Sequence, residues 1–150
     1  MMYFILICIL IFVDQVSKHF AVVRLKPKKR WVLIEGKLDL TYLENRGAAY
    51  GLFAKYQKGL KVFISLSLCC LIAVFVRNIG VYGHGFDLAM TFLVSGGIGN
   101  LIDRYRWGYV IDFIEIKIKK FPVFNLADFF VLMGASMLCV FIVKYDIVWL

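Results

Sequence analysis

Four long apolar runs, separated by polar segments, dominate the pattern of side chains along this chain. They cover residues 1–23, 62–76, 88–102 and 121–143. The two middle runs are short, because an uncharged helix of about 15 residues rises roughly 22 Å against a hydrocarbon core of about 30 Å. We therefore expect both to extend past their flanking charges, with Lys61 and Arg77 reaching back to the interface. The pattern predicts four membrane-spanning helices.

The polar segment at residues 24–61 is too long to be a simple connection between two helices. Within it, residues 31–34 and 38–43 are predicted to form two short strands around the turn Glu35-Gly36-Lys37. Residues 114–121 alternate apolar and polar side chains, which suits a strand or a surface helix lying along the membrane. We therefore expect a mainly α-helical membrane protein that carries a small β-sheet on the membrane surface.

Composition supports the membrane location. Hydrophobic residues make up 62% of the 150 residues and the mean hydropathy is +0.81, values typical of an integral membrane protein. The net charge of +8 would suggest a nucleic acid partner in a soluble protein. Here the basic clusters flank spanning helices, where they attract anionic lipid headgroups, and no signature of a nucleic-acid-binding fold accompanies them. The expected partners are membrane lipids, and no nucleic acid is expected.

The remaining bulk features are less informative. The four cysteines lie inside the apolar runs without a CxxC spacing, so they are predicted to be small buried side chains. The first run has no basic segment before it and no small-residue cleavage site after it, so we interpret it as a retained span. Because no internal repeat or low-complexity tract is visible, residues 1–150 are expected to form one domain.

Three aspartates lie near or inside the last two apolar runs. Asp103 and Asp112 fall within residues 96–113, and Asp128 lies one turn inside the last run. An ionisable group at bilayer depth costs from ~3 to more than 10 kcal/mol, so it is usually either fully paired or functional. No cation within the last run can neutralise Asp128, so its partner must come from elsewhere in the fold. We predict that this partner is Asp112.

Two facing aspartates are suited to the hydrolysis of an amide. A close pair cannot easily ionise twice, so one member keeps a proton while the other stays charged. The ionised carboxylate can then take a proton from the attacking water, and the protonated one can support the carbonyl oxygen and later the leaving nitrogen. The competing interpretation is a transporter or ion-conducting bundle in which the acids line a polar path, although the paired halves common in transporters are not visible.

Other polar residues allow two interpretations. Asp14 and Lys18 are four residues apart and share a helix face, which favours a structural ion pair over a catalytic role. Residues 44–51 include several small residues around Asn45, so they form either a loop that lets a peptide backbone approach closely or a tight turn. Asp103 and Arg104 either form a local charge pair at a helix end or hold substrate and orient the aspartates.

Other proteolytic chemistries lack their residues. A metalloprotease helix needs histidines at i and i+4 with a glutamate, and the only histidines are His19 and His84. An intramembrane serine protease needs a histidine base, and none accompanies Ser95. The nearest match to the Gly-x-Gly-Asp turn of presenilin-type proteases ends in Asn100 instead of an aspartate. No metal or organic cofactor is expected.

With these residues in view, the chain resembles lipoprotein signal peptidase, the bacterial signal peptidase II family, over nearly its whole length. The motifs that carry the resemblance are Asp14-Gln15 with Lys18, Asn45-x-Gly47-x-Ala49, Gly97-x-x-Asn100-x-x-Asp103-Arg104, Gly108-x-Val110-x-Asp112-Phe113 and Phe124-Asn125-x-Ala127-Asp128. Any one of them is a weak match. In this order, between four spans, they are highly specific.

The resemblance implies a four-helix intramembrane aspartyl endopeptidase with a small β-sheet cradle and a short surface helix on the extracytoplasmic side. Such an enzyme removes the signal peptide from a prolipoprotein by cutting just before a cysteine that carries diacylglyceryl. The implied catalytic pair is Asp112 and Asp128. The implied substrate-binding and supporting residues are Asn45, Gly47, Asn100, Asp103, Arg104, Asn125, Asp14 and Lys18.

The family also implies a monomer in the bacterial cytoplasmic membrane, with both termini cytoplasmic and the active site near the extracytoplasmic face. The distribution of basic residues opposes this orientation. Lys and Arg concentrate in residues 24–61 and in the loop after the third run, whereas the middle loop has only Arg77. The positive-inside rule alone would place the basic loops in the cytoplasm. We follow the family's orientation because the motif match is more specific than a charge count.

Overall fold

Four long helices form the body of the protein in the computed structural model, which describes residues 1–28, 30–47, 52–119 and 121–145. Helix α1 (Met2–Phe20) continues through a π-helical segment, η1 (Ala21–Leu25), into the short α2 (Lys26–Lys28). A 3₁₀ turn, η3 (Ala54–Tyr56), precedes α3 (Gln57–Asn78), and α4 (His84–Arg106) and α5 (Leu126–Tyr145) follow. All four long helical stretches are apolar enough and long enough to cross a membrane. The prediction of four spans is confirmed, and the two middle helices do extend past their flanking charges.

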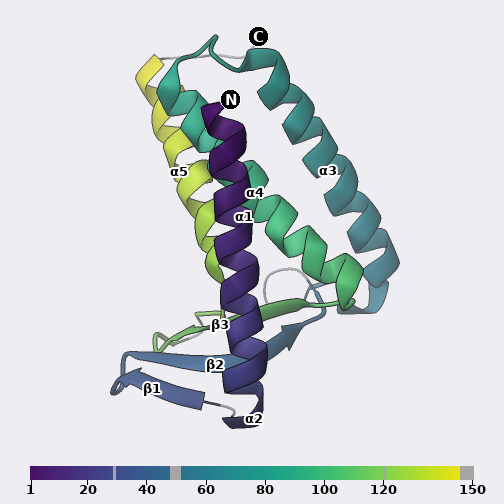
Figure 1. Cartoon of the computed structure of the whole chain (residues 1–150), viewed down its shortest axis with the longest axis vertical. Helices are drawn as coiled ribbons and strands as arrows, with labels where there is room; N and C mark the ends of the chain where they lie inside the picture. Colours follow the sequence, from purple (N-terminus) through teal and green to yellow (C-terminus); the bar gives the residue numbers. More distant parts are fainter. Residues whose placement is uncertain (29, 48–51, 120, 146–150) are drawn as a thin grey trace.

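A three-stranded antiparallel sheet closes one end of the bundle. Its strands are β1 (Arg30–Ile34), β2 (Leu38–Asn45) and β3 (Val110–Ile116), in the order β1-β2-β3. Figure 1 shows the sheet at the end of the bundle opposite the N-terminus and the end of α5. The two predicted strands at residues 31–34 and 38–43 are confirmed. For residues 114–121, the structure continues a strand as far as Ile116, so the strand is the correct interpretation there.

Local interactions explain why the first two strands form a hairpin. Gly36 has φ +69°, a left-handed conformation that glycine adopts without strain, and Lys37 N donates to Ile34 O at 3.0 Å. Asp39 on β2 is fully buried and lies 2.5 Å from Arg30 Nη2 and 3.0 Å from Lys117 Nζ. This ion cluster therefore ties β1 and the chain just after β3 to the central strand.

Helix α4 packs closely against its neighbours because glycines face them. A Cβ at Gly96 would collide with the carbonyl oxygen of Ala127 on α5, and one at Gly134 would lie 2.6 Å from the carbonyl oxygen of Ala89. A Cβ at Gly99 would lie 2.6 Å from Asp14 Oδ2 on α1. Such small residues let backbones approach where lipid provides no hydrophobic force between helices. Two apolar clusters complete the packing, one between α1, α3 and α4, and one between η1 and β3.

The cysteines are not buried, so that prediction is wrong. Cys8, Cys69, Cys70 and Cys139 are exposed on the outer surface of the helices. In a membrane this surface meets lipid rather than water, so a small apolar side chain gains little by turning inward. Of the predicted loop at residues 44–51, residues 44 and 45 belong to β2, and residues 48–51 lie outside the described residues.

Candidate active site

Asn125 connects Asp112 and Asp128 at the junction of the sheet and the bundle. Its side-chain Nδ2 donates to Asp112 Oδ1 at 2.7 Å. Asn125 also caps α5, because its Oδ1 accepts from Asp128 N at 2.9 Å while Asp128 Oδ2 accepts from Asn125 N at 3.2 Å. This reciprocal arrangement is a capping box, and it fixes both the start of the helix and the position of Asp128. One asparagine thus contacts both of the acids that the sequence paired.

Each aspartate also accepts a hydrogen bond from a second asparagine. Asn45 Nδ2 donates to Asp112 Oδ2 at 3.0 Å, and Asn100 Nδ2 donates to Asp128 Oδ1 at 2.7 Å. The two acids differ in exposure, because Asp112 is buried in β3 whereas Asp128 is half-buried. The buried acid is therefore held within the protein, and the other acid lies where it can be reached from outside.

The environment of Asp112 favours its protonated form. Burial, followed by the negative charge of Asp128, raises the pKa of this carboxyl to about 7, against the lowering effect of the amide hydrogen bonds from Asn45 and Asn125. A carboxyl with a pKa near neutrality can exchange a proton during a reaction. The pair is therefore suited to general acid and base chemistry.

A buried ion cluster lies directly behind the two aspartates. Lys18 Nζ lies 2.9 Å from Asp14 Oδ2 and 3.1 Å from Asp103 Oδ2, and all three side chains are almost fully buried. The predicted pairing of Asp14 with Lys18 is confirmed. Asp103 turns toward Lys18 rather than Arg104, so the local charge pair considered for residues 103 and 104 is not formed.

The two acids of this cluster hold the residues that immediately precede Asp112 and Asp128. Asp103 Oδ2 accepts from the backbone N–H of Ile111 at 3.1 Å, and Asp14 Oδ1 accepts from that of Ala127 at 2.9 Å. Helices α4 and α1 thus position the strand and the helix that carry the pair. The motif residues Asp14 and Asp103 consequently belong to one continuous polar network with the site.

Arg104 reaches the loop that follows β2. Its Nη2 donates to Gly47 O at 2.8 Å, and Gly47 N in turn donates to Asn45 Oδ1 at 3.1 Å. The guanidinium lies within electrostatic reach of Asp112 and Asp128. Its Nε is buried and has no hydrogen-bond partner among the described residues. This N–H is available to an acceptor that enters the site.

Gln15 is also part of the site, although no role was predicted for it. Gln15 Nε2 lies within 3.2 Å of Asp14 Oδ2, Gly99 O and Asp103 Oδ1, so it links α1 to α4 inside the network. Its amide inside an apolar run was a usable signal, because a buried amide needs partners. All the other site residues that the sequence singled out fall in or beside this network. Within the described residues, no cluster of His, Cys, Asp or Glu could hold a metal ion.

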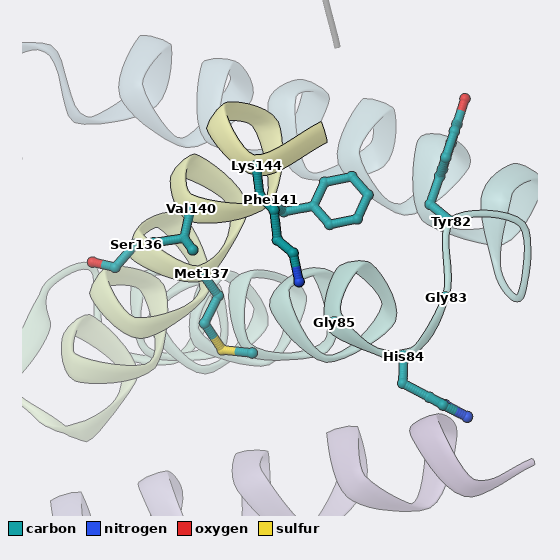
Figure 2. Close-up of a pocket in the computed structure, with 9 residues that line it drawn as sticks. All are labelled: Tyr82, Gly83, His84, Gly85, Ser136, Met137, Val140, Phe141 and Lys144. Carbon is teal, nitrogen blue, oxygen red and sulfur yellow. The ribbon is translucent and has the colours of Figure 1, made fainter. Parts of the chain in front are cut away.

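A cavity of about 430 Å³ lies at the other end of the molecule and is not part of this site. Figure 2 shows its walls, formed by the last turns of α5 and the beginning of α4, with the Lys144 side chain pointing between them. His84 on its rim points toward α1, where its Nδ1 lies 2.6 Å from the hydroxyl of Tyr3. The lining residues include neither Asp nor Glu, so this cavity offers no acid pair.

Comparison with known proteins agrees with the geometry. The family model for signal peptidase (SPase) II matches residues 6–144. The chain is 36% identical to the lipoprotein signal peptidase of Clostridioides difficile, covering 97% of both proteins. It is 40% identical to that of Syntrophomonas wolfei, covering 89% of this chain and 87% of the relative. A solved structure described as a bacterial membrane enzyme superposes with a TM-score of 0.87 at 25% identity, covering 97% of this chain and 90% of that one. The chain therefore belongs to the signal peptidase II family, the lipoprotein signal peptidases, which are membrane proteases that remove signal peptides from prolipoproteins.

Proposed function

We propose that this protein is an intramembrane aspartyl endopeptidase that cuts diacylglyceryl-modified prolipoproteins just before the lipidated cysteine. Asp112 and Asp128 are the proposed catalytic residues. The observation that carries the proposal is the single side chain of Asn125, which hydrogen-bonds Asp112 and forms a capping box with Asp128. The family's role in removing signal peptides supports the same class of reaction.

The proposed reaction uses one ionised and one protonated carboxyl. Water placed between the carboxyls gives a proton to the ionised one as its oxygen attacks the scissile carbonyl carbon, and the protonated carboxyl donates to the carbonyl oxygen. The tetrahedral intermediate then collapses: one of its hydroxyls gives a proton to the carboxyl that is now ionised, the C–N bond breaks, and the leaving nitrogen takes up the proton of the other carboxyl. Each step conserves protons between the two acids, the water and the products.

The substrate backbone is proposed to lie between the loop at Asn45 and Gly47 and the N-terminus of α5. The unpartnered Nε of Arg104 can donate to a substrate carbonyl there, because it is buried beside the acids and lacks an acceptor in the described part of the chain. A buried donor without an acceptor costs about 1–3 kcal/mol, so a substrate carbonyl that accepts from it gains binding energy. Asn100 and Asn125 complete the polar lining.

The test compares acid-to-amide substitutions in purified protein with a lipidated prolipoprotein peptide. Asp112→Asn and Asp128→Asn are each expected to lower the cleavage rate by about 10³-fold or more, because each acid transfers a proton in the reaction. Asp39→Asn is the matched control, because Asp39 is as buried as Asp112 but belongs to the sheet's ion cluster. Cleavage near the wild-type rate by folded Asp112→Asn or Asp128→Asn protein would contradict the catalytic assignment.

The specificity for lipid is tested with the same peptide lacking diacylglyceryl. The proposal predicts efficient cleavage of the lipidated peptide only, at the bond before the modified cysteine, as located by mass spectrometry. Equal cleavage of both peptides, or cleavage at another bond, would contradict the proposed specificity for the lipidated cysteine. It would not contradict the proposed peptidase activity.

We further propose that the protein acts as a single-domain monomer in the bacterial cytoplasmic membrane, with the sheet on the extracytoplasmic side. The N-terminus and the end of α5 lie together at the end opposite the sheet, so both would be cytoplasmic (Figure 1). A cysteine at Lys37 should react with a membrane-impermeant maleimide in intact cells, whereas one at Arg77 should not. The reverse labelling would support the orientation favoured by the basic residues and overturn this part of the proposal.

A further inference from the structure

Lys18 makes one more contact than charge neutralisation requires. Lys18 is 1% exposed, and its ammonium lies near two carboxylates, those of Asp14 and Asp103, which are sufficient to balance its charge. The third partner is neutral, because Nζ donates to Asn100 Oδ1 at 3.0 Å. An ammonium has three N–H donors and no acceptor. Each of the three N–H groups thus has a partner, and one of them is aimed at a residue that touches Asp128.

This contact determines which way the Asn100 amide points. Because Lys18 can only donate, the oxygen of Asn100 must face it, and the NH₂ group must face the other way. Nδ2 of Asn100 accordingly donates to Asp128 Oδ1 at 2.7 Å. An ammonium on the oxygen also polarises the amide, which strengthens the donor at its other end. The charge of Lys18 is thereby transmitted to Asp128 through one side chain.

Asp128 is held as an acceptor more firmly than Asp112. Its second oxygen accepts from the backbone N–H of Asn125 at 3.2 Å, and the first turn of a helix favours a negative charge. Asp112 lies on a strand without a helix end. Its donor from Asn125 is shared, because the same Nδ2 also lies within 3.3 Å of Asn100 Oδ1 and Ile111 O. The two carboxyls therefore differ in how well a negative charge is supported.

We propose that Lys18 is a positioning residue for the cleavage reaction: by holding the oxygen of Asn100 it turns the amide N–H toward Asp128. This makes Asp128 the ionised base and leaves the proton on Asp112. The inference rests on the proposed aspartyl peptidase function and assigns the two roles within it. It also gives the motif residue Lys18 a role beyond stabilising the fold.

The other charged groups around Asp128 do not replace this contact. Asp112 on β3 carries the other carboxyl of the pair, and the Arg104 guanidinium on α4 lies within electrostatic reach of both acids. Asp14 on α1 and Asp103 on α4 lie behind Lys18 and contact its ammonium. Among the hydrogen bonds to Asp128 from described side chains, the one from Asn100 links it to a buried cation.

The experiment measures how kcat/KM for a lipidated peptide depends on pH in the Lys18→Met and Asn100→Leu variants. The acid limb of the profile reports ionisation of the base in the free enzyme. In both variants we expect this limb to move to higher pH by about 1 unit or more, because a hydrogen bond that favours the ionised form is lost. Activity should be partly recovered at the higher pH. Asn100→Leu leaves Lys18 with both of its carboxylates, so it tests the link from Lys18 through Asn100 to Asp128 even if Lys18→Met fails to fold.

Gln15→Leu is the control for a purely structural effect. Gln15 contacts Asp14 and Asp103 but not Asn100, so its loss should lower the melting temperature without moving the acid limb. If the folded Asn100→Leu variant keeps the acid limb at the wild-type pH, or is inactive at every pH, the proposed link from Lys18 through Asn100 to Asp128 is overturned. The same two results in folded Lys18→Met would also overturn it. Failure of the aspartyl mechanism itself would appear separately, as activity retained by Asp112→Asn or Asp128→Asn.

Discussion

The backbone N–H of Ala127 donates to Asp14 Oδ1 at 2.9 Å, which joins the middle of α1 to the residue before Asp128. Together with the hydrogen bond from Ile111 N to Asp103 Oδ2, it places each acid of the pair next to a backbone group held by a buried carboxylate. Both of these carboxylates share the ammonium of Lys18. The ion cluster therefore sets the separation between the strand and the helix that carry the candidate site.

Removing one acid of this cluster should destabilise the protein strongly. Asp14→Asn removes a buried carboxylate that accepts from both Lys18 and the backbone N–H of Ala127, and a hydrogen bond to a charged group contributes about 1.5–3 kcal/mol. We expect a melting temperature in detergent well below that of the wild type. Glu44→Gln is the control, because Glu44 pairs with Lys26 at the surface, where such pairs contribute about 0–1 kcal/mol. Equal melting temperatures for the two variants would contradict the structural role of Asp14.

Asn125→Ala should affect both stability and catalysis. It removes the cap of α5, which is worth about 1 kcal/mol, and it removes a hydrogen bond to each of the two aspartates. We expect a modest fall in melting temperature and a cleavage rate lower by about 10²-fold, because misplacement of catalytic groups is that damaging. Asn78→Ala provides the comparison, since Asn78 is remote from the site and its side chain donates to Val74 O within its own helix. A folded Asn125→Ala protein with near-normal cleavage would show that Asn125 does not orient the pair.

The raised pKa of Asp112 predicts a pH dependence of both rate and stability. If Asp112 must carry a proton, cleavage should decline as pH rises through about 7. The folded protein also binds this proton more strongly than the unfolded chain, so the associated stability is present below about pH 4 and is lost as pH rises toward 7. The melting temperature of the wild type should fall across this range, and that of Asp112→Asn should fall less. Parallel curves for the two proteins would show that Asp112 does not titrate in this window.

The sequence predicted the parts of the fold that follow from periodicity. Uninterrupted apolar runs identified the four helices, and alternation with the turn at Gly36 identified β1 and β2. Strand β3 was predicted only from residue 114 onward, because its first four residues, Val110 to Phe113, are all buried. A strand covered on both faces shows no alternation. The part of the strand that was missed is the part that carries Asp112.

The candidate site was predictable to a similar degree. Scarce polar residues in apolar surroundings pointed to Asp112, Asp128 and their asparagines. The partner of Asp103 could not be found this way, because the neighbouring Arg104 was the obvious choice whereas Lys18 is remote in the chain. The hydrogen bonds from Ile111 and Ala127 were also invisible, because every residue except proline has the same backbone N–H. Long-range contacts of this kind need coordinates.

Gly99→Ala offers the sharpest test of the packing between α1 and α4. The added Cβ would lie 2.6 Å from Asp14 Oδ2 and 3.2 Å from the Cβ of Ala127, so α1 would have to move away from the cluster. Overpacking of this kind costs about 1–3 kcal/mol.

Gly59→Ala is the matched control, because a Cβ there meets nothing within 4 Å and alanine favours a helix by about 1 kcal/mol. Thermal unfolding should therefore place Gly99→Ala below the wild type and Gly59→Ala at or above it. Cleavage should fall in Gly99→Ala alone, because displacement of Asp14 also displaces the segment that carries Asp128. If Gly99→Ala matches the wild type in both measurements, α1 does not hold α5 through this close approach.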